Sequence, residues 1–434
     1  MATSPLPRGV SVCTVARFSA SCKNGLFGNE PHCRQRYGRR RSRFVDDRLM
    51  TSMEGKISVS LRHSDGRVTA AAISSDRPLR VARLFEDRDL QWTLATVPRV
   101  FSVCGVAQGL AASRAAQAAL GCRPPAFVES ARETLLLAET AREHLWRILI
   151  DWPRARGEQP GSELSFLGGL IGRFRDASFG SADPFRLAPY PVADAADRDL
   201  AIRELREVIA ERVFGVDPER WLAVDGELGP VDARGEADRH LAWIARSGWS
   251  GAGAVRSEPL PEQCATEIGA RLGAADADTF IARPQWRGSC RETSAFSRHA
   301  DHPRVAAVVD RYGPGLLARL VARLVDLALI PSRMIDLHQS PYDQSGHTWG
   351  DPSRHIGVAC VNAARGLLVH RLEIADGRVR RYRILAPTEW NFHPDGVAAQ
   401  GLLTLGGNTA DIERQARAWL EAVDPCVEYQ IGIA

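Results

Sequence analysis

The chain has 434 residues, of which 44% are hydrophobic and 25% are charged, a composition typical of a globular protein with a sizeable core. A membrane-spanning helix needs about eighteen apolar residues in a row, and even the segment 316–330 is interrupted by Arg319, Arg323 and Asp326. The formal net charge is +4, but the whole net excess of positive charge lies in the first 49 residues, so we expect neither membrane insertion nor nucleic-acid binding by a basic folded face.

Residues 1–49 contain ten basic and three acidic residues, which leaves this segment at +7 and the rest of the chain at −3. We predict a basic disordered tail here, followed by one domain over 50–434. No apolar stretch follows the arginine-rich run, so it does not have the layout of a secretory or twin-arginine signal. It is either a transit peptide or, as we favour, an upstream extension before a working start at Met50 or Met53.

The cysteines are nine in number, which is odd, and they are scattered through a chain too large to need disulfide bonds for stability. This pattern predicts a reduced compartment, and we expect a cytoplasmic protein. Four of them, which share no Cys-x-x-Cys spacing, are expected to be structural: Cys122, Cys264, Cys290 and Cys360.

In chain order, alternating apolar residues over 54–72 around Asp65-Gly66 predict a β-hairpin. Small and apolar residues from Val106 to Leu120 predict a buried helix. A longer amphipathic helix is expected over Ser130–Ile150, with Ser130 and Glu133 at the spacing of a capping box.

The second half of the chain also contains patterns typical of helices and of a hairpin. Helices are expected over Asp197–Phe214, Gly313–Leu329 and Thr409–Val423, and a second hairpin over Arg365–Ala386. The segment 215–263 has no clear period and is expected to be irregular or mixed. Together these elements predict a single α+β domain, mostly helical, with peripheral antiparallel hairpins.

The segment around Cys104 resembles the first cysteine motif of nickel–iron hydrogenase large subunits, Arg-x-Cys-Gly-x-Cys-x-x-x-His-Ala-Leu-Ala. Aligned on Arg99 and on the later Leu-Ala pair, the motif places its first cysteine on Phe101, its second on Cys104 and its histidine on Gln108. Near the end of the chain, Asp-Pro-Cys426 resembles the family's Asp-Pro-Cys-x-x-Cys-x-x-His. Tyr429 and Gly432 stand where the second cysteine and the histidine would be.

Other segments strengthen this resemblance because they occur in the same order along the chain. Arg365-Gly366 and the residues up to His370 resemble Arg-Gly-x-Leu-x-His, and Pro387-Thr388 with the following Trp-Asn resembles Pro-Thr-Thr-Trp-Asn. Glu54-Gly55-Lys56 resembles Ile-Glu-Gly-His, with lysine in place of histidine. Thr293–Arg298 resembles the family's Gly-Pro-Leu-Ala-Arg element more weakly.

A large-subunit pattern with one cysteine kept in each motif is similar to the hydrogenase maturation proteins of the HupK/HoxV type. The resemblance implies a large-subunit-like fold and a scaffold, chaperone-like in role, on which iron carrying cyanide and carbonyl ligands is held before transfer. Its implied partners are the maturation chaperones that deliver the iron and the large-subunit precursor that receives it.

The resemblance also implies a role for individual residues. Cys104 corresponds to a cysteine that bridges nickel and iron, and Cys426 to one that binds nickel alone. Two thiolates do not enclose a binuclear centre that takes four, but they suffice for one iron that brings three diatomic ligands. We therefore expect Cys104 and Cys426 to be the metal ligands.

Four further residues are implied to surround the cargo. Arg365 and Thr388 match positions that face the cyanide ligands, to which a guanidinium and a hydroxyl donate hydrogen bonds. Gln108 keeps hydrogen-bonding capacity where the family has histidine, but it does not titrate. Glu54 matches a carboxylate that relays protons in the family.

Two alternatives to a scaffold remain open from the sequence. One is a metal-free structural subunit of a redox complex, like the relative in respiratory complex I that has lost all four cysteines. The other is a hydrogenase variant in which Tyr429 or Gln108 substitutes as a metal ligand. We expect, however, that this protein is not an enzyme. A separate metal site at His299, Asp301 and His302 is also conceivable, but paired histidines on a polar stretch are more often exposed to solvent.

Overall fold

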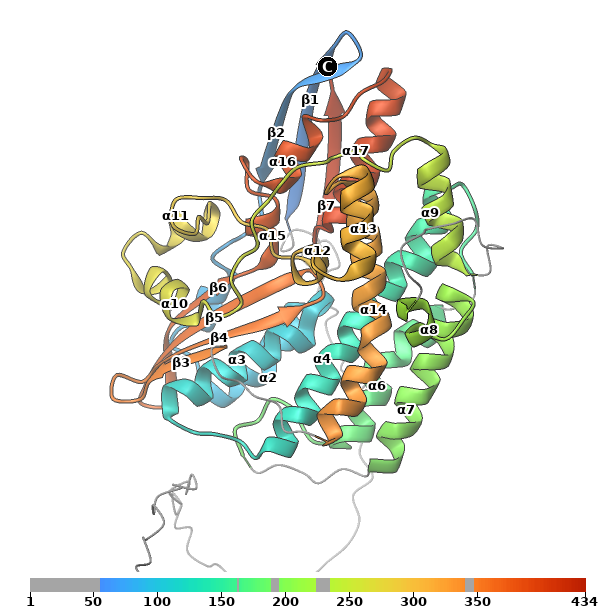
Figure 1. The fold of residues 1–434 in the computed structure, drawn as a ribbon. Helices are drawn as coiled ribbons and strands as arrows, with labels where there is room; N and C mark the ends of the chain where they lie inside the picture. Colours follow the sequence, from blue (N-terminus) through green and yellow to red (C-terminus); the bar gives the residue numbers. More distant parts are fainter. Residues whose placement is uncertain (1–54, 162–163, 189–194, 224–234, 340–346) are drawn as a thin grey trace, which may run out of the picture. The chain divides into compact units, whose positions relative to one another are not determined.

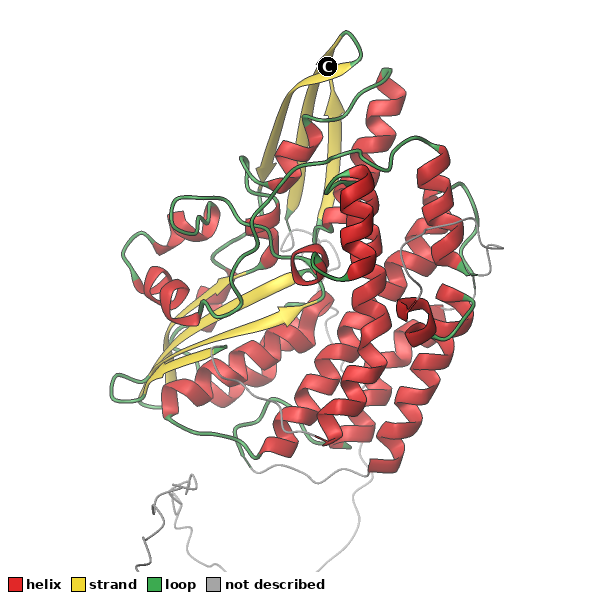
Figure 2. Cartoon of the chain, viewed as in Figure 1, coloured by secondary structure: helices red, strands yellow, loops and turns green. Residues whose placement is uncertain are grey.

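Helices make up most of the chain that the structure describes, and two small sheets lie among them (Figure 2). The structure is a computed structural model, and it describes residues 55–161, 164–188, 195–223, 235–339 and 347–434. This architecture confirms the predicted α+β class. The predicted tail over 1–49 and Glu54 lie outside the described residues.

The largest apolar core lies between long helices that run side by side in Figure 1. They are α4 (Ala126–Trp146), α6 (Leu164–Phe179), α7 (Ala195–Val208) and α14 (Leu316–Gln339). Helix α7 continues into a π-helical turn that ends at Phe214, as predicted. Helix α14 runs on past the predicted end at Leu329, through Pro331.

The predicted capping box at Ser130 and Glu133 is wrong, because α4 begins four residues earlier, after Pro125. Both residues are buried inside the helix. The carboxylate of Glu133 lies 2.9 Å from Arg114 of helix α3 (Gly105–Leu120), and Glu129 pairs with the same guanidinium at 2.9 Å. The acidic residues of α4 therefore join two helices rather than cap one.

Helix α3 lies along a four-stranded antiparallel sheet with the order β3-β4-β5-β6 (Figure 1). The strands are β3 (Thr348–Asp351), β4 (Ile356–Ala363), β5 (Gly366–Ala375) and β6 (Arg378–Leu385). A Cβ atom on Gly357 would lie 1.9 Å from the carbonyl oxygen of Ala115, so only glycine allows β4 to approach the alanine-rich helix this closely. This contact fixes α3, and with it Cys104 at the start of the helix.

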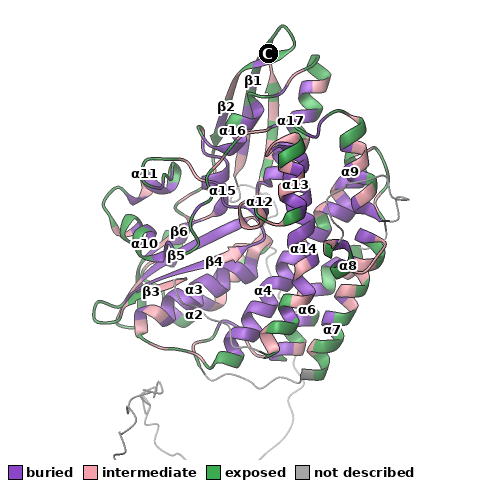
Figure 3. Ribbon diagram, viewed as in Figure 1, coloured by how far each residue is buried: buried purple, intermediate pink, exposed green. Residues whose placement is uncertain are grey.

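The predicted hairpin over 365–386 is confirmed as β5 and β6. Strands β4 and β5 are buried along nearly their whole length, as the purple strands in Figure 3 show. They are therefore more central than the peripheral hairpins that were predicted. Alternate residues of β4 face opposite sides, with Ala359 in the core beside α3 and Val358 and Cys360 in the core beside α10 (Ala265–Gly273).

A three-stranded sheet with the order β2-β1-β7 packs against α16 (Val397–Leu402) and α17 (Thr409–Val423). Strands β1 (Lys56–Ser64) and β2 (Arg67–Ser75) confirm the first hairpin. Strand β7 (Glu428–Ile433) pairs in parallel with β1, and this pairing was not predicted. It ties the segment after Cys426 to the other end of the domain sequence.

Shorter elements connect these layers. In chain order they are η1 (Val81–Phe85), α2 (Leu90–Val100), η2 (Ser102–Cys104), η3 (Arg147–Asp151), α5 (Trp152–Ala155), η4 (Ile209–Phe214), α8 (Pro218–Ala223), α9 (Glu236–Arg246), α11 (Ala277–Ala282), α12 (Ala295–His299), α13 (Pro303–Tyr312) and α15 (Pro387–Asn391). Helices α8 and α9 fall in the segment expected to be irregular or mixed. Across the described ranges no single helix is long and apolar enough to cross a membrane, whereas the pair Leu90–Val100 and Ser102–Leu120, bent by 95°, meets that length and composition together.

Candidate site at Cys104 and Cys426

Cys104 ends the short turn η2 and immediately precedes α3. Its thiol is partly buried. Burial, together with the nearby charges of Glu139 and Cys426, raises the pKa of Cys104 to about 12, although Arg365 and a hydrogen bond from Gln108 act in the opposite direction. The thiol of Cys104 is therefore protonated near neutral pH, and binding a metal would displace that proton.

A chain of buried side chains ends on the sulfur of Cys104. The Gln108 amide donates to its Sγ at 3.7 Å, and the Gln108 Oε1 lies 2.9 Å from the Nε2 of His370. Tyr382 closes the chain, with its hydroxyl 2.8 Å from the Nδ1 of His370. Burial lowers the pKa of His370 to about 3, so the ring is neutral. Nε2 then donates to Gln108, Nδ1 accepts from Tyr382, and the amide nitrogen is left facing the sulfur.

Glu139 of α4 supports the same end of α3. Its two carboxylate oxygens accept hydrogen bonds from the backbone N–H groups of Val106 and Ala107, at 2.8 and 2.9 Å. Burial raises the pKa of Glu139 to about 7, against these two hydrogen bonds. The carboxylate thus satisfies donors that the first turn of a helix leaves free.

Cys426 lies in the loop between α17 and β7, and its thiol is partly buried. The hydroxyl of Thr388, in α15, donates to the Sγ of Cys426 at 3.0 Å. Thr388 itself is buried. Of the residues predicted to contact a ligand, Thr388 is thus already directed at the second sulfur.

Arg365 lies beside both thiols, held by two carboxylates. It pairs with Glu143 at 2.9 Å and with Asp424 at 3.2 Å. Burial works against its charge, but the charges of Asp424, Glu143, Cys426 and Cys104 together raise the pKa of Arg365. Asp424 lies two residues before Cys426, so Arg365 adjoins the segment that carries this cysteine.

Asp424 is the centre of the ionic network on this side. Besides Arg365 it pairs with Arg147 at 2.8 Å and with Arg323 at 3.3 Å. Burial alone would raise the pKa of Asp424, but the three arginines lower it. Asp424 belongs to the Asp-Pro-Cys motif, but its three arginine partners could not be predicted from the motif, because they lie far from it along the chain.

Arg77 is one of several residues near the site, with Glu139 and Tyr382, that sequence reasoning missed. It follows β2 and forms an ion pair with Glu389, the residue after Thr388. No motif marks it, and its spacing from either cysteine carries no information. A basic residue in a loop is usually solvated, so nothing in the sequence pointed to it.

The positions of the two lost cysteines are occupied by residues engaged elsewhere. Phe101 packs against the core beside α3, and the Tyr429 hydroxyl donates to Glu421 at 3.1 Å. Burial and Glu421 raise the pKa of Tyr429, which makes a phenolate ligand costly. Gly432 pairs with Ser60 of β1.

The remaining sequence candidates lie in other surroundings. We expected His299 to be exposed to solvent, but its Nε2 lies 2.7 Å from the Asp326 carboxylate. His302 accepts a backbone hydrogen bond at the start of α13. In the ranges that the structure describes, no group of three His, Cys, Asp or Glu side chains is placed to hold a metal ion. Cys264 and Cys360 are buried with their sulfurs 3.9 Å apart.

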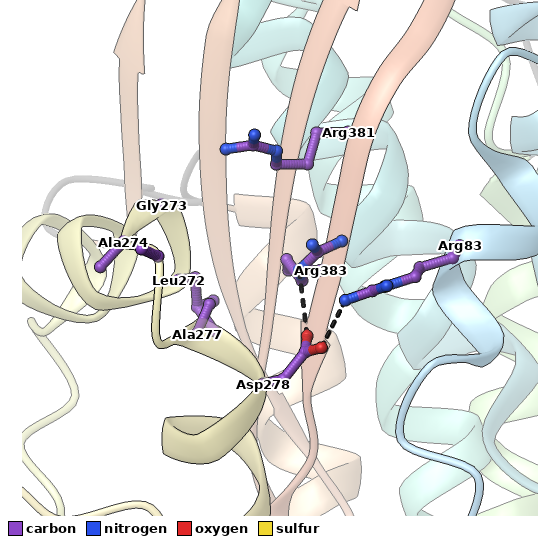
Figure 4. Close-up of a pocket in the computed structure, with 9 residues that line it drawn as sticks. Arg83, Leu272, Gly273, Ala274, Ala277, Asp278, Arg381 and Arg383 are labelled. Atoms are coloured by element: carbon purple, nitrogen blue, oxygen red, sulfur yellow. Dashed lines mark hydrogen bonds and ion pairs between the residues drawn. The ribbon is translucent and has the colours of Figure 1, made fainter.

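A separate polar pocket of about 330 Å³ lies between η1, α11 and β6 (Figure 4). Asp278 is held there by Arg83 and, at 3.7 Å, by Arg383. None of the residues that line this pocket belongs to the cysteine site. Its Arg83–Asp278 pair is therefore a useful reference for ion pairs within the site.

The fold is that of a nickel–iron hydrogenase large subunit. Residues 315–403 match the family model for nickel-dependent hydrogenase. The structure is similar to the nickel–iron–selenium hydrogenase of Desulfovibrio vulgaris Hildenborough, with a TM-score of 0.59, 13% sequence identity, and coverage of 84% of this chain and 94% of that one. The enzyme from Desulfomicrobium baculatum gives a TM-score of 0.57 at 14% identity, covering 87% and 97%.

Relatives that match this chain along most of their length define its family more closely. The hydrogenase expression/formation protein HoxV of Cupriavidus necator is 32% identical over 83% of this chain and 92% of its own length. The corresponding HupK of Azotobacter vinelandii is 30% identical, over 88% and 99%. The chain belongs to this HoxV/HupK family of hydrogenase expression/formation proteins.

Proposed function

We propose that this chain acts in hydrogenase maturation as a scaffold that holds an iron–cyanide–carbonyl unit between Cys104 and Cys426. The observation that supports this most is that the Thr388 hydroxyl donates to the Sγ of Cys426 at 3.0 Å, while Arg365 pairs with Asp424, two residues before that cysteine. The donor set also suits such a cargo, because soft thiolates bind iron and the Thr388 hydroxyl and Arg365 guanidinium are donors for cyanide nitrogens. When bound, the cargo supplies the metal and its diatomic ligands.

The same geometry supports transient holding over turnover. The two family positions that lack cysteine carry Phe101 and Tyr429, which are engaged in the core and with Glu421. Two sulfurs hold an iron with fewer bonds than four, so the unit can leave. We propose a cytoplasmic binding protein without hydrogenase activity, which receives iron from the maturation chaperones and passes it to the large-subunit precursor.

Infrared spectroscopy tests this proposal directly. The chain is produced together with the general maturation machinery and purified without oxygen, and we expect stretching bands of cyanide and carbonyl in its spectrum. The Cys104→Ala/Cys426→Ala variant should lack them.

A matched control removes two other thiols, in the Cys122→Ala/Cys290→Ala variant, and should keep the bands. Absence of bands from the wild-type protein, or their persistence in the Cys104→Ala/Cys426→Ala variant, would reject the proposed site.

A further inference from the structure

Arg77 is held against the residue before β1, and its ion-pair partner Glu389 adjoins Thr388 of the cysteine site. Gly55 has a φ of +72°, and a Cβ atom there would lie 2.5 Å from the Cα of Arg77, so the backbone packs directly on Arg77. The side chain of Arg77 is 18% exposed and that of its partner Glu389 only 7%. This is a largely buried cation, and it needs compensation nearby.

The paired carboxylate of Glu389 compensates the charge of the guanidinium. Burial works against the charge of Arg77, but Cys426, then Glu389, then Cys104 raise its pKa. The main causes acting on Glu389 are its burial, Arg77 and the backbone of α15. Glu389 adjoins Thr388, whose hydroxyl donates to the Sγ of Cys426 at 3.0 Å, so the Arg77–Glu389 pair lies next to the cysteine site.

Arg77 also has spare hydrogen-bonding capacity. Its Nε is buried and has no hydrogen-bond partner within the described part of the chain. Arg365 differs, because Glu143 and Asp424 both hold it. A buried donor without a partner is costly, and a ligand that accepts from it would remove that cost.

We propose that Arg77 is a specificity-determining residue of the cysteine site, which selects a metal unit carrying anionic, hydrogen-bond-accepting ligands and disfavours a bare divalent cation. This inference rests on the proposed function. With Arg365, Arg77 places a second guanidinium beside the thiols, and a naked dication is repelled by both. A unit whose cyanide nitrogens point outward instead accepts from them.

Cobalt binding tests the exclusion of bare cations without any maturation machinery. Reduced full-length protein is titrated with Co²⁺, and the sulfur-to-cobalt charge-transfer absorption reports binding by Cys104 and Cys426. In the Arg77→Gln/Glu389→Gln variant we expect binding about tenfold tighter than in the wild-type protein, because a like charge close to the metal is removed. Arg77→Lys, which keeps the charge, should bind as weakly as the wild type.

The Arg83→Gln/Asp278→Asn variant removes a more exposed ion pair from the separate pocket (Figure 4), and its cobalt affinity should be unchanged. Far-ultraviolet circular dichroism establishes that each variant is folded. Equal cobalt affinity of the wild-type protein and the Arg77→Gln/Glu389→Gln variant would overturn the inference.

The infrared spectrum tests the second part of the proposal, which is that Arg77 recognises the anionic ligands of the metal unit. If Arg77 donates to a cyanide, Arg77→Lys should shift the cyanide bands relative to the wild type and leave the carbonyl band nearly in place. Unmoved cyanide bands would contradict this role of Arg77. A wild-type protein without any bands would reject the proposed function instead, while the cobalt titration would still decide on exclusion of the bare cation.

Discussion

The two cysteines of the site are held in different ways. Cys104 starts a buried helix, and it is reached by the neutral chain of Gln108, His370 and Tyr382. Cys426 lies in a loop beside Asp424, which is surrounded by arginines. One sulfur is thus positioned by hydrogen bonds and packing, and the other by an ionic network.

This difference suggests a division of tasks. The side of Cys104 is rigid, because α3 packs on the sheet through Gly357, and its thiol stays protonated near neutral pH. The side of Cys426 depends on charges that a cargo with anionic ligands would join. A carrier gains from one fixed ligand and one whose surroundings respond to the cargo.

The ionic side should be the more fragile of the two. Replacing Asp424 by Asn, which tolerates the left-handed backbone found there (φ 67°), leaves Arg147, Arg323 and Arg365 without their shared carboxylate. We expect a loss of about 3–5 kcal/mol in the free energy of unfolding, as for other broken buried ion pairs. Urea unfolding followed by circular dichroism measures it.

The control is Asp278→Asn, whose side chain is 32% exposed and should cost about 1 kcal/mol or less. The pKa of Asp424 is lowered, so its stabilising effect is present above about pH 4 and is lost as the pH falls. The wild type and the Asp424→Asn variant should therefore converge in acid. Equal losses in the two Asn variants would contradict the comparison.

The side of Cys104 should respond to alkaline pH instead. Its pKa is raised from an ordinary value of 9.0 to about 12, so the unfolded chain loses the thiol proton first. Stability is then fully present below pH 9 and falls as the pH rises toward 12, by about 1.4 kcal/mol per pH unit. Urea unfolding at pH 8 and pH 10 measures this slope.

Cys104→Ser, which does not titrate in this range, should have a flatter pH profile by that amount at pH 10. Cys264→Ser serves as a comparison for the loss of a buried thiol in the core beside α10. Parallel profiles for the wild type and Cys104→Ser would show that folding does not raise the pKa of Cys104.

Breaking the hydrogen bonds between Gln108, His370 and Tyr382 should lower the free energy of unfolding by a smaller amount. Tyr382→Phe leaves the Nδ1 of His370 buried without a donor, and we expect a cost of about 1–2 kcal/mol. Tyr429→Phe removes a hydroxyl from the more exposed β7 and should cost less. If Tyr382→Phe left the free energy of unfolding unchanged, the hydrogen bonds through His370 and Tyr382 would not be what positions Gln108.

Much of the fold could be predicted from local patterns. The hairpin turns at Asp65-Gly66 and Asp376-Gly377 and the helix Thr409–Val423 carry strong local signals, and the structure has them where expected. The start of α4 could not be predicted, because Glu133 was assigned to a cap and its partner Arg114 lies on another helix. The parallel pairing of β7 with β1 likewise depends on contacts between the two ends of the domain.

The candidate site divides along the same line. Residues inside motifs, such as Thr388 and Arg365, could be proposed from resemblance, and the structure places both beside the thiols. Arg77 and Tyr382 lie in no motif, and their importance comes from burial and from neighbours distant in sequence. Glu54 lies outside the described residues, so its role stays a prediction.

The smallest effect concerns the hydroxyl of Thr388, which donates to the sulfur of Cys426. Cysteine sulfur is a weak hydrogen-bond acceptor, so Thr388→Val should cost only about 0.5–1 kcal/mol, and Thr388→Ser should recover most of it. A double-mutant cycle with Cys426→Ala isolates the contact. A coupling near 0.5 kcal/mol indicates a thiol, whereas about 2 kcal/mol would indicate a thiolate held by a charge-assisted hydrogen bond. The second outcome would mean that the ionic side is already poised for a metal, and it would sharpen the contrast with Cys104.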